Sequence, residues 1–68
     1  MSESYDYVRR MYGVNPVIGS RVRHNEVNRW GTIVRASASH GHYVRVRFDG
    51  EKHASNCHPT ALDYEAQP

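Results

Sequence analysis

The sequence predicts one small, mostly β domain, a five-stranded barrel with a short N-terminal α-helix at about residues 4–12. The chain has 68 residues, a length that holds one domain, so residues 1–68 form a single unit. Apolar residues recur at helical spacing only near the N-terminus and alternate with polar residues from residue 18 onward. Short strands with tight turns in so few residues are best closed into a barrel, at about residues 18–64.

The helix expected at Ser4–Tyr12 presents one apolar face. Its members recur at helical spacing: Tyr5, Val8, Met11 and Tyr12. Ser4 is the expected N-cap and Gly13 the expected residue after the C-cap, and Asn15-Pro16 ends the helix. A helix this short is unstable alone, so its apolar face must dock on the β core.

Five strands are expected after the helix, at Ser20–His24, Trp30–Ser37, His42–Phe48, Glu51–Asn56 and Leu62–Tyr64. The third alternates most clearly, with Val44, Val46 and Phe48 facing inward. In the second, Thr32-Ile33-Val34 is apolar on both faces, so the sequence leaves open which face of residues 30–37 is buried.

The predicted turns contain small and polar residues. They are Asn25–Asn28, Ala38–Gly41, a two-residue hairpin at Asp49-Gly50, and a tight or 3₁₀ turn at His58-Pro59-Thr60. Residues 66–68 are expected to be frayed.

The small size limits both the core and the chemistry. A domain of this length buries only about 60% of the surface that its unfolded chain exposes. We therefore expect Trp30, Phe48 and the five tyrosines to supply much of the buried area. A ligand pocket of about 300 Å³ or more has little room, so we expect a protein that is not an enzyme.

Charge is distributed unevenly along the chain. The formal net charge is only +2, yet the central segment is basic, with Arg21, Arg23, Arg29, Arg35, Arg45 and Arg47. Arginine's planar fork suits phosphate and carboxylate groups. The pattern fits a phosphate-binding surface and fits equally well a solvated outer face with cross-strand ion pairs.

Three segments carry a resemblance to a known fold. They are Ile18-Gly19-Ser20-Arg21-Val22, Trp30-Gly31-Thr32-Ile33-Val34 and Tyr43-Val44-Arg45-Val46-Arg47-Phe48. Together they resemble the SH3-like barrel, in particular the KOW motif of transcription and ribosomal proteins, although the turn at Asn25–Asn28 contains no glycine. The whole chain, with Tyr12-Gly13-Val14 before the barrel and His58-Pro59-Thr60 after it, resembles small uncharacterised bacteriophage and prophage proteins. That resemblance implies a bacterial cytoplasm and assigns no activity.

The leading functional hypothesis is an accessory protein that binds DNA or RNA. If the valines face inward, alternation places arginines outward on neighbouring strands, where basic and aromatic groups bind phosphates and bases. The candidate residues are Arg21, Arg23, Arg35, Arg45 and Arg47, with Tyr43 and Trp30 as stacking faces.

The alternative is a protein-interaction module for a host or phage protein, using the same face or the tyrosine-rich helix. The sequence marks no oligomeric interface, so a monomer and a weak dimer both stay open.

Metal binding, catalysis and membrane insertion are not expected. The candidate ligands His40, His42, His53, Cys57 and His58 include one thiol and no Cys-x-x-Cys pair. Cys57 and His58 are adjacent and would point to opposite faces of a strand, which argues against a nucleophile–base pair. We expect no cofactor. A single cysteine excludes an intramolecular disulfide, and neither a signal peptide nor a membrane span is expected.

Overall fold

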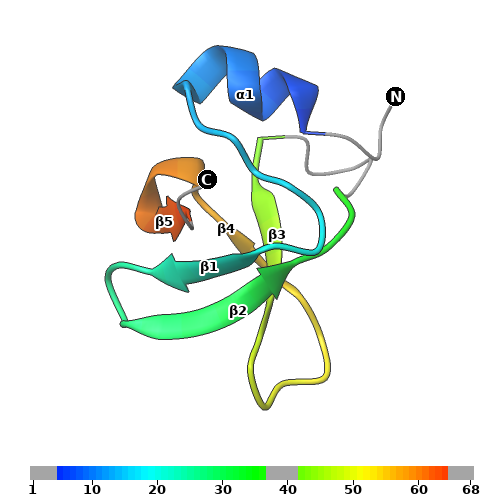
Figure 1. The fold of residues 1–68 in the computed structure, drawn as a ribbon, viewed down its shortest axis with the longest axis vertical. Coiled ribbons are helices and arrows are strands. Elements are labelled where there is room, and N and C mark those ends of the chain that lie inside the picture. The colour runs from blue at the N-terminus through cyan, green and yellow to red at the C-terminus, as the bar shows by residue number, and fades with distance from the viewer. Residues whose placement is uncertain (1–4, 37–41, 65–68) are drawn as a thin grey trace.

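The fold is mostly β, as the sequence predicts. The computed structural model describes residues 5–36 and 42–64. Its elements are α1 (Asp6–Tyr12), β1 (Arg21–His24), β2 (Arg29–Ile33), β3 (Val44–Phe48), β4 (Ser55–Cys57), the 3₁₀ turn η1 (Pro59–Ala61) and β5 (Leu62–Tyr64). The five strands form one antiparallel sheet in the order β4-β3-β2-β1-β5, curled into a half-barrel with α1 across one end (Figure 1).

Some expectations lie outside the described residues. These are the Ser4 N-cap, the last residue of the strand expected to end at Ser37, the turn at Ala38–Gly41 with His40, and the frayed residues 66–68.

The inner face of the half-barrel holds the core. The buried side chains on the strands and their flanks are Val22, Ile33, Ala36, Val44, Val46, Phe48, Cys57 and Leu62. The alternation predicted for β3 is confirmed, because its three apolar residues are buried while Arg45 and Arg47 are not. Within the described residues no ladder joins β4 to β5, and η1 connects these two edge strands instead.

β2 resolves the question that its sequence left open. Gly31 and Ile33 face the core, Thr32 is partly exposed, and Trp30 is 46% exposed on the other face. The expectation that Trp30 contributes to the buried core is therefore wrong. Gly31 pairs with Phe48, and its missing side chain lets the two strands pack closely.

The return strand begins later than the sequence predicts. β4 spans Ser55–Cys57, and its ladder pairs Val46 with Ser55 and Val44 with Cys57. Asp49-Gly50 forms the expected tight turn, in which the Glu51 N–H donates to the Phe48 carbonyl at 3.0 Å and Gly50 has a positive φ of 88°. The ladder register centres the hairpin between Gly50 and Glu51, so the expectation that the strands pair directly across a two-residue loop is wrong. The observed register buries Cys57 opposite Val44.

α1 begins at Asp6, and Tyr5 caps it without a side-chain hydrogen bond. Gly13 adopts the left-handed conformation (φ 69°), as expected after the C-cap, and its N–H donates to the Arg9 carbonyl. The docked face is narrower than predicted. Tyr5 and Val8 are buried and Tyr12 packs against the core, but Met11 is 58% exposed.

The Tyr5 hydroxyl enters the ladder between β2 and β3. One position beyond the pair of Ile33 with Val46, the Val34 N–H donates to the Arg45 carbonyl at 3.0 Å. The reciprocal bond is replaced by a bridge: the Tyr5 hydroxyl donates to the Val34 carbonyl at 2.5 Å and accepts from the Arg45 N–H at 3.1 Å. The helix is thus anchored where β2 ends.

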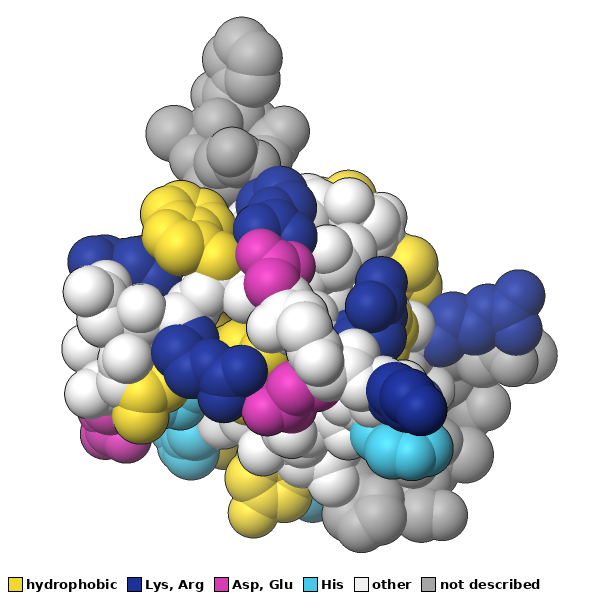
Figure 2. Space-filling view, turned by 90° about the horizontal axis from the view of Figure 1, so that it is seen from below, with side chains coloured by type: hydrophobic (Ala, Val, Ile, Leu, Met, Phe, Trp, Pro, Cys, Tyr) yellow, Lys and Arg dark blue, Asp and Glu magenta, His cyan; other side chains and the backbone are white. Residues whose placement is uncertain are grey.

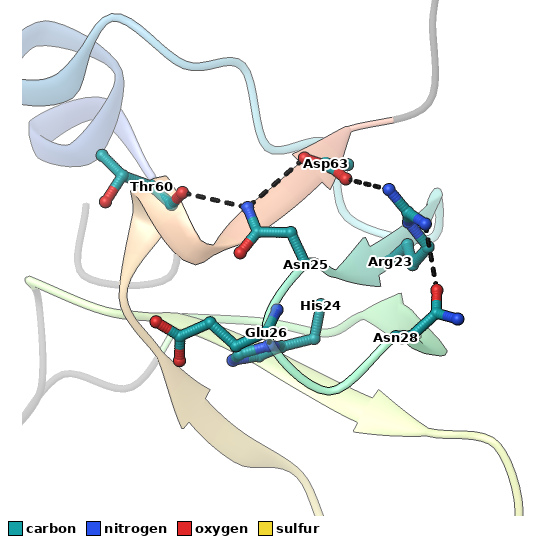
Figure 3. A network of polar contacts seen from close by, with 7 residues as sticks. All are labelled: Arg23, His24, Asn25, Glu26, Asn28, Thr60 and Asp63. Atoms are coloured by element: carbon teal, nitrogen blue, oxygen red, sulfur yellow. Dashed lines mark hydrogen bonds and ion pairs between the residues drawn. The ribbon is translucent and has the colours of Figure 1, made fainter.

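The β1–β2 turn is tied to the C-terminal strand (Figure 3). Asn28 takes the left-handed conformation (φ 58°) that a glycine would adopt more easily, and its side chain accepts from Arg23 at 2.9 Å. The Asn25 N–H donates to the Ala61 carbonyl at 2.8 Å, and the Asn25 side chain reaches Thr60 and Asp63. These contacts fix the sheet edge beside the candidate site.

Candidate nucleic-acid interface

The outer face of the sheet carries most of the predicted site residues. Because Val22, Gly31 and the β3 valines face the core, the alternate residues Arg21, Arg23, Trp30, Arg45 and Arg47 point outward. The strand register aligns Arg21, Thr32 and Arg47 in one row across three strands. A second row runs Asp63, Arg23, Trp30, and then Asp49, whose N–H donates to the Trp30 carbonyl at 3.0 Å.

Arg21 and Arg23 are both paired with carboxylates. Arg21 binds Asp49 through two hydrogen bonds, of 2.8 and 2.6 Å, and also donates to the Thr32 hydroxyl at 3.1 Å. Arg23 donates to Asp63 at 2.5 Å. On the face seen in Figure 2, acidic side chains are interspersed among the basic ones, and no continuous basic surface forms there.

These pairs lower the pKa values of both carboxyl groups. Hydrogen bonding to Arg21, aided by its positive charge, lowers the pKa of Asp49 below its usual value. Hydrogen bonds from Arg23 and then Asn25 lower the pKa of Asp63. Both groups therefore remain ionised to a lower pH in the folded chain than in the unfolded one.

We expect this difference to appear as acid sensitivity. A carboxyl group with a lowered folded pKa stabilises the fold above its unfolded pKa of about 3.9, and that contribution disappears as the pH falls through the folded pKa. Thermal unfolding of the wild type should therefore show a decline in Tm below about pH 4 that is shallower in the variant D49N/D63N. Equal acid dependence in the two proteins would contradict the assignment.

The outward residues at and just before β3 form a second part of this face. We call Tyr43, Arg45 and Arg47 the β3 strip. Among residues 5–36 and 42–64, neither of its arginines forms an ion pair within 4.0 Å. Arg45 is half-buried and donates to the Arg35 carbonyl at 3.2 Å, whereas Arg47 is exposed and acts on Asp49 only at longer range.

Two of the predicted residues, Tyr43 and Arg35, lie outside the strands. Tyr43 is 41% exposed, and Arg35 is exposed in the segment that follows β2. The structure therefore places Arg21, Arg23, Trp30, Arg45 and Arg47 on the outer face, leaves Tyr43 exposed just before β3, and leaves Arg35 exposed after the end of β2. The four arginines on the strands fall into two groups. Arg21 and Arg23 form ion pairs near Trp30, whereas Arg45 and Arg47 belong to the β3 strip.

The sequence analysis allowed for cross-strand ion pairs but did not identify Asp63 as a partner of Arg23. The pairing of β5 with β1 places Asp63 beside Arg23, and no local sequence signal indicates that neighbour.

Arg29 differs from the outer-face arginines in its surroundings. It pairs with Glu51 at 3.0 Å and lies over the Phe48 ring, so it covers the edge of the core.

The histidines that the structure describes do not converge with Cys57. No cluster of potential metal ligands occurs in the described segments. Cys57 is buried, which raises the pKa of its thiol. The His58 Nδ1 accepts from the Thr60 N–H at 3.2 Å, while the His58 ring contacts Tyr12. In the part of the chain that the structure describes, no helix is long and apolar enough to cross a membrane.

A scan against protein-family models found no match to this chain, and searches of curated proteins and of solved structures also found none. The function is therefore argued from the site alone.

Proposed function

We propose that this domain binds nucleic acid through the β3 strip. The observation that carries the proposal is the position of Arg45 and Arg47, which lie two residues apart on one strand, face outward, and have no ion-pair partner among the described residues. A phosphate that approaches these arginines displaces no carboxylate. At Arg21 and Arg23 it would compete with Asp49 and Asp63.

The expected binding is weak and depends on salt. Two phosphate contacts give a slope of log K against log salt of about −1.8 on duplex or about −1.4 on a single strand. Four equivalent arginines would give about −3.6 on duplex. The structure favours the smaller value because Arg21 and Arg23 are already paired. Non-specific affinities should lie at about 10⁻⁴ to 10⁻⁶ M.

A matched pair of variants tests the strip. R47A and R10A each remove one exposed arginine, but Arg10 lies on α1 and not on the outer face of a strand. We expect R47A to flatten the salt slope by about 0.7–0.9 and R10A to leave it nearly unchanged, measured by fluorescence anisotropy of a labelled oligonucleotide. Equal effects of both variants would mean that only net charge matters. Absence of binding at low salt would refute the function.

The biological setting is part of the same proposal. The segments Tyr12-Gly13-Val14 and His58-Pro59-Thr60 support a phage or prophage accessory protein in a bacterial cytoplasm. The curled five-stranded half-barrel with its short helix is compatible with an SH3-like domain.

A protein partner is the second candidate, and the surroundings of Trp30 favour it. This exposed side chain lies between Arg23 and Asp49, each held in an ion pair. Tryptophan and arginine are enriched at the energetic centres of protein interfaces. If protein binding is the function, W30A should abolish capture of a partner from bacterial lysate while R47A leaves it intact.

A further inference from the structure

We infer that the ligand of this face is a single strand of nucleic acid, with its phosphates along β3 and its bases turned toward Trp30. This inference rests on the proposed function and specifies the class of nucleic acid. It follows from the order of charged and aromatic residues on the outer face.

The phosphate-binding groups are arranged along one strand. Arg45 and Arg47 are two residues apart in β3, which separates their Cα atoms by about 7 Å and keeps both on one face. Adjacent phosphates of an extended, unstacked strand can match this spacing. The two arginines therefore define a direction along β3.

Exposed aromatic rings lie near both ends of this line. Tyr43 comes two residues before Arg45, and Trp30 lies in the row just beyond Arg47, beside Asp49. β3 spans Val44–Phe48, so the line from Tyr43 to Asp49 is at most about 20 Å long, which is room for about three nucleotides. Both rings are more than 40% exposed and can stack on bases.

The carboxylates set the orientation. Asp49 and Asp63 lie in the same row as Trp30 and occupy Arg21 and Arg23 in ion pairs, so a phosphate gains less there than on the β3 strip. Carboxylate oxygens accept hydrogen bonds from the exocyclic amino groups of bases. A nucleic-acid strand with its backbone over β3 and its bases over Trp30 therefore places its phosphates at Arg45 and Arg47. Its base amino groups then lie beside the carboxylates near Trp30.

A duplex does not satisfy this arrangement. Its bases are stacked on one another, so it presents edges rather than the ring faces that aromatic side chains need. The sheet is also curled, and a straight duplex would touch its outer surface over a small area (Figure 1).

Trp30 itself provides the test, because it is the only tryptophan in the chain. The full chain is titrated at low salt and neutral pH with an oligodeoxycytidylate of about eight nucleotides, whose bases carry exocyclic amino groups, and with a duplex of the same length. We expect the single strand to quench the Trp30 fluorescence and to bind about tenfold or more tightly than the duplex. In anisotropy measurements W30A should weaken single-strand binding about tenfold, W30F should retain most of it, and neither should alter duplex binding.

The outcomes separate the two proposals. Equal binding of both forms with unchanged fluorescence would overturn the single-strand inference and leave the nucleic-acid function standing. Binding of neither form would overturn both. Circular dichroism confirms that the variants fold, which we expect because Trp30 is 46% exposed.

Discussion

Replacing Gly31 by alanine is expected to unfold the domain or come close to it. An added Cβ would lie 2.5 Å from the Val46 Cγ1, 2.8 Å from the Arg47 carbonyl oxygen and 3.0 Å from the Phe48 Cα. Two of these atoms belong to the backbone of β3, so relief requires the sheet itself to move. We expect a loss of at least about 3 kcal/mol, the upper end of the usual range for overpacking, measured by urea unfolding.

The matched control adds the same methyl group in open space. Gly13 has no atom within 4 Å of the added Cβ, so G13A should cost only the strain of its positive φ, about 1–2 kcal/mol. The double variant G31A/V46A removes the closest clash and should be more stable than the sum of the single effects predicts. Equal stability of G31A and G13A would contradict the close packing of β2 on β3.

Removal of the Tyr5 hydroxyl is expected to cause the second-largest loss of folding stability. Tyr5 is 2% exposed, and its hydroxyl satisfies both the Val34 carbonyl and the Arg45 N–H. In Y5F both groups lose this partner in a buried position, at a cost of about 1–3 kcal/mol. Because each kcal/mol shifts the Tm of a domain this small by about 4–8 °C, thermal unfolding should detect the change readily.

Y7F is the control for the tyrosine substitution. Tyr7 lies on the same helix and is partly exposed, so loss of its hydroxyl should change the stability by less than about 0.5 kcal/mol. Amide hydrogen exchange at Arg45 should also accelerate in Y5F alone. If Y5F and Y7F behave alike, the bridge does not stabilise the ladder.

The parts of the fold that were predicted correctly follow from local pattern. Alternation in Val44–Phe48 identified the most regular strand and its buried side, and Gly13 marked the end of the helix. Proline in His58-Pro59-Thr60 indicated the 3₁₀ turn, which the structure has at Pro59–Ala61. In each case the residues concerned carry the conformational preference themselves.

The wrong predictions concern features that are set by packing between residues far apart in the sequence. The two-residue hairpin at Asp49-Gly50 was a sound local expectation, but burial of Cys57 opposite Val44 selects a different register. Trp30 was expected in a core short of large residues. Its strand instead presents Gly31 and Ile33 to the interior, which leaves Trp30 outside.

The charges of the candidate site show the same limit. Side-chain alternation predicts correctly that Arg21, Arg23, Arg45 and Arg47 lie on the outer side of the sheet. Which of them are neutralised depends on strand neighbours, and Asp63 is 40 residues from Arg23 in sequence. The division between ion-paired arginines and the β3 strip therefore appears only in three dimensions.

The neighbour relation between the first strand and the last has a kinetic consequence. β1 lies between β2 and β5, so its second edge stays unsatisfied until Leu62–Tyr64 has been synthesised. During translation the helix and the first three strands can associate early, but the sheet cannot be completed before Leu62–Tyr64 has left the ribosome. Closing this long loop should limit the folding rate. A truncated product ending before β5 would expose a strand edge to aggregation.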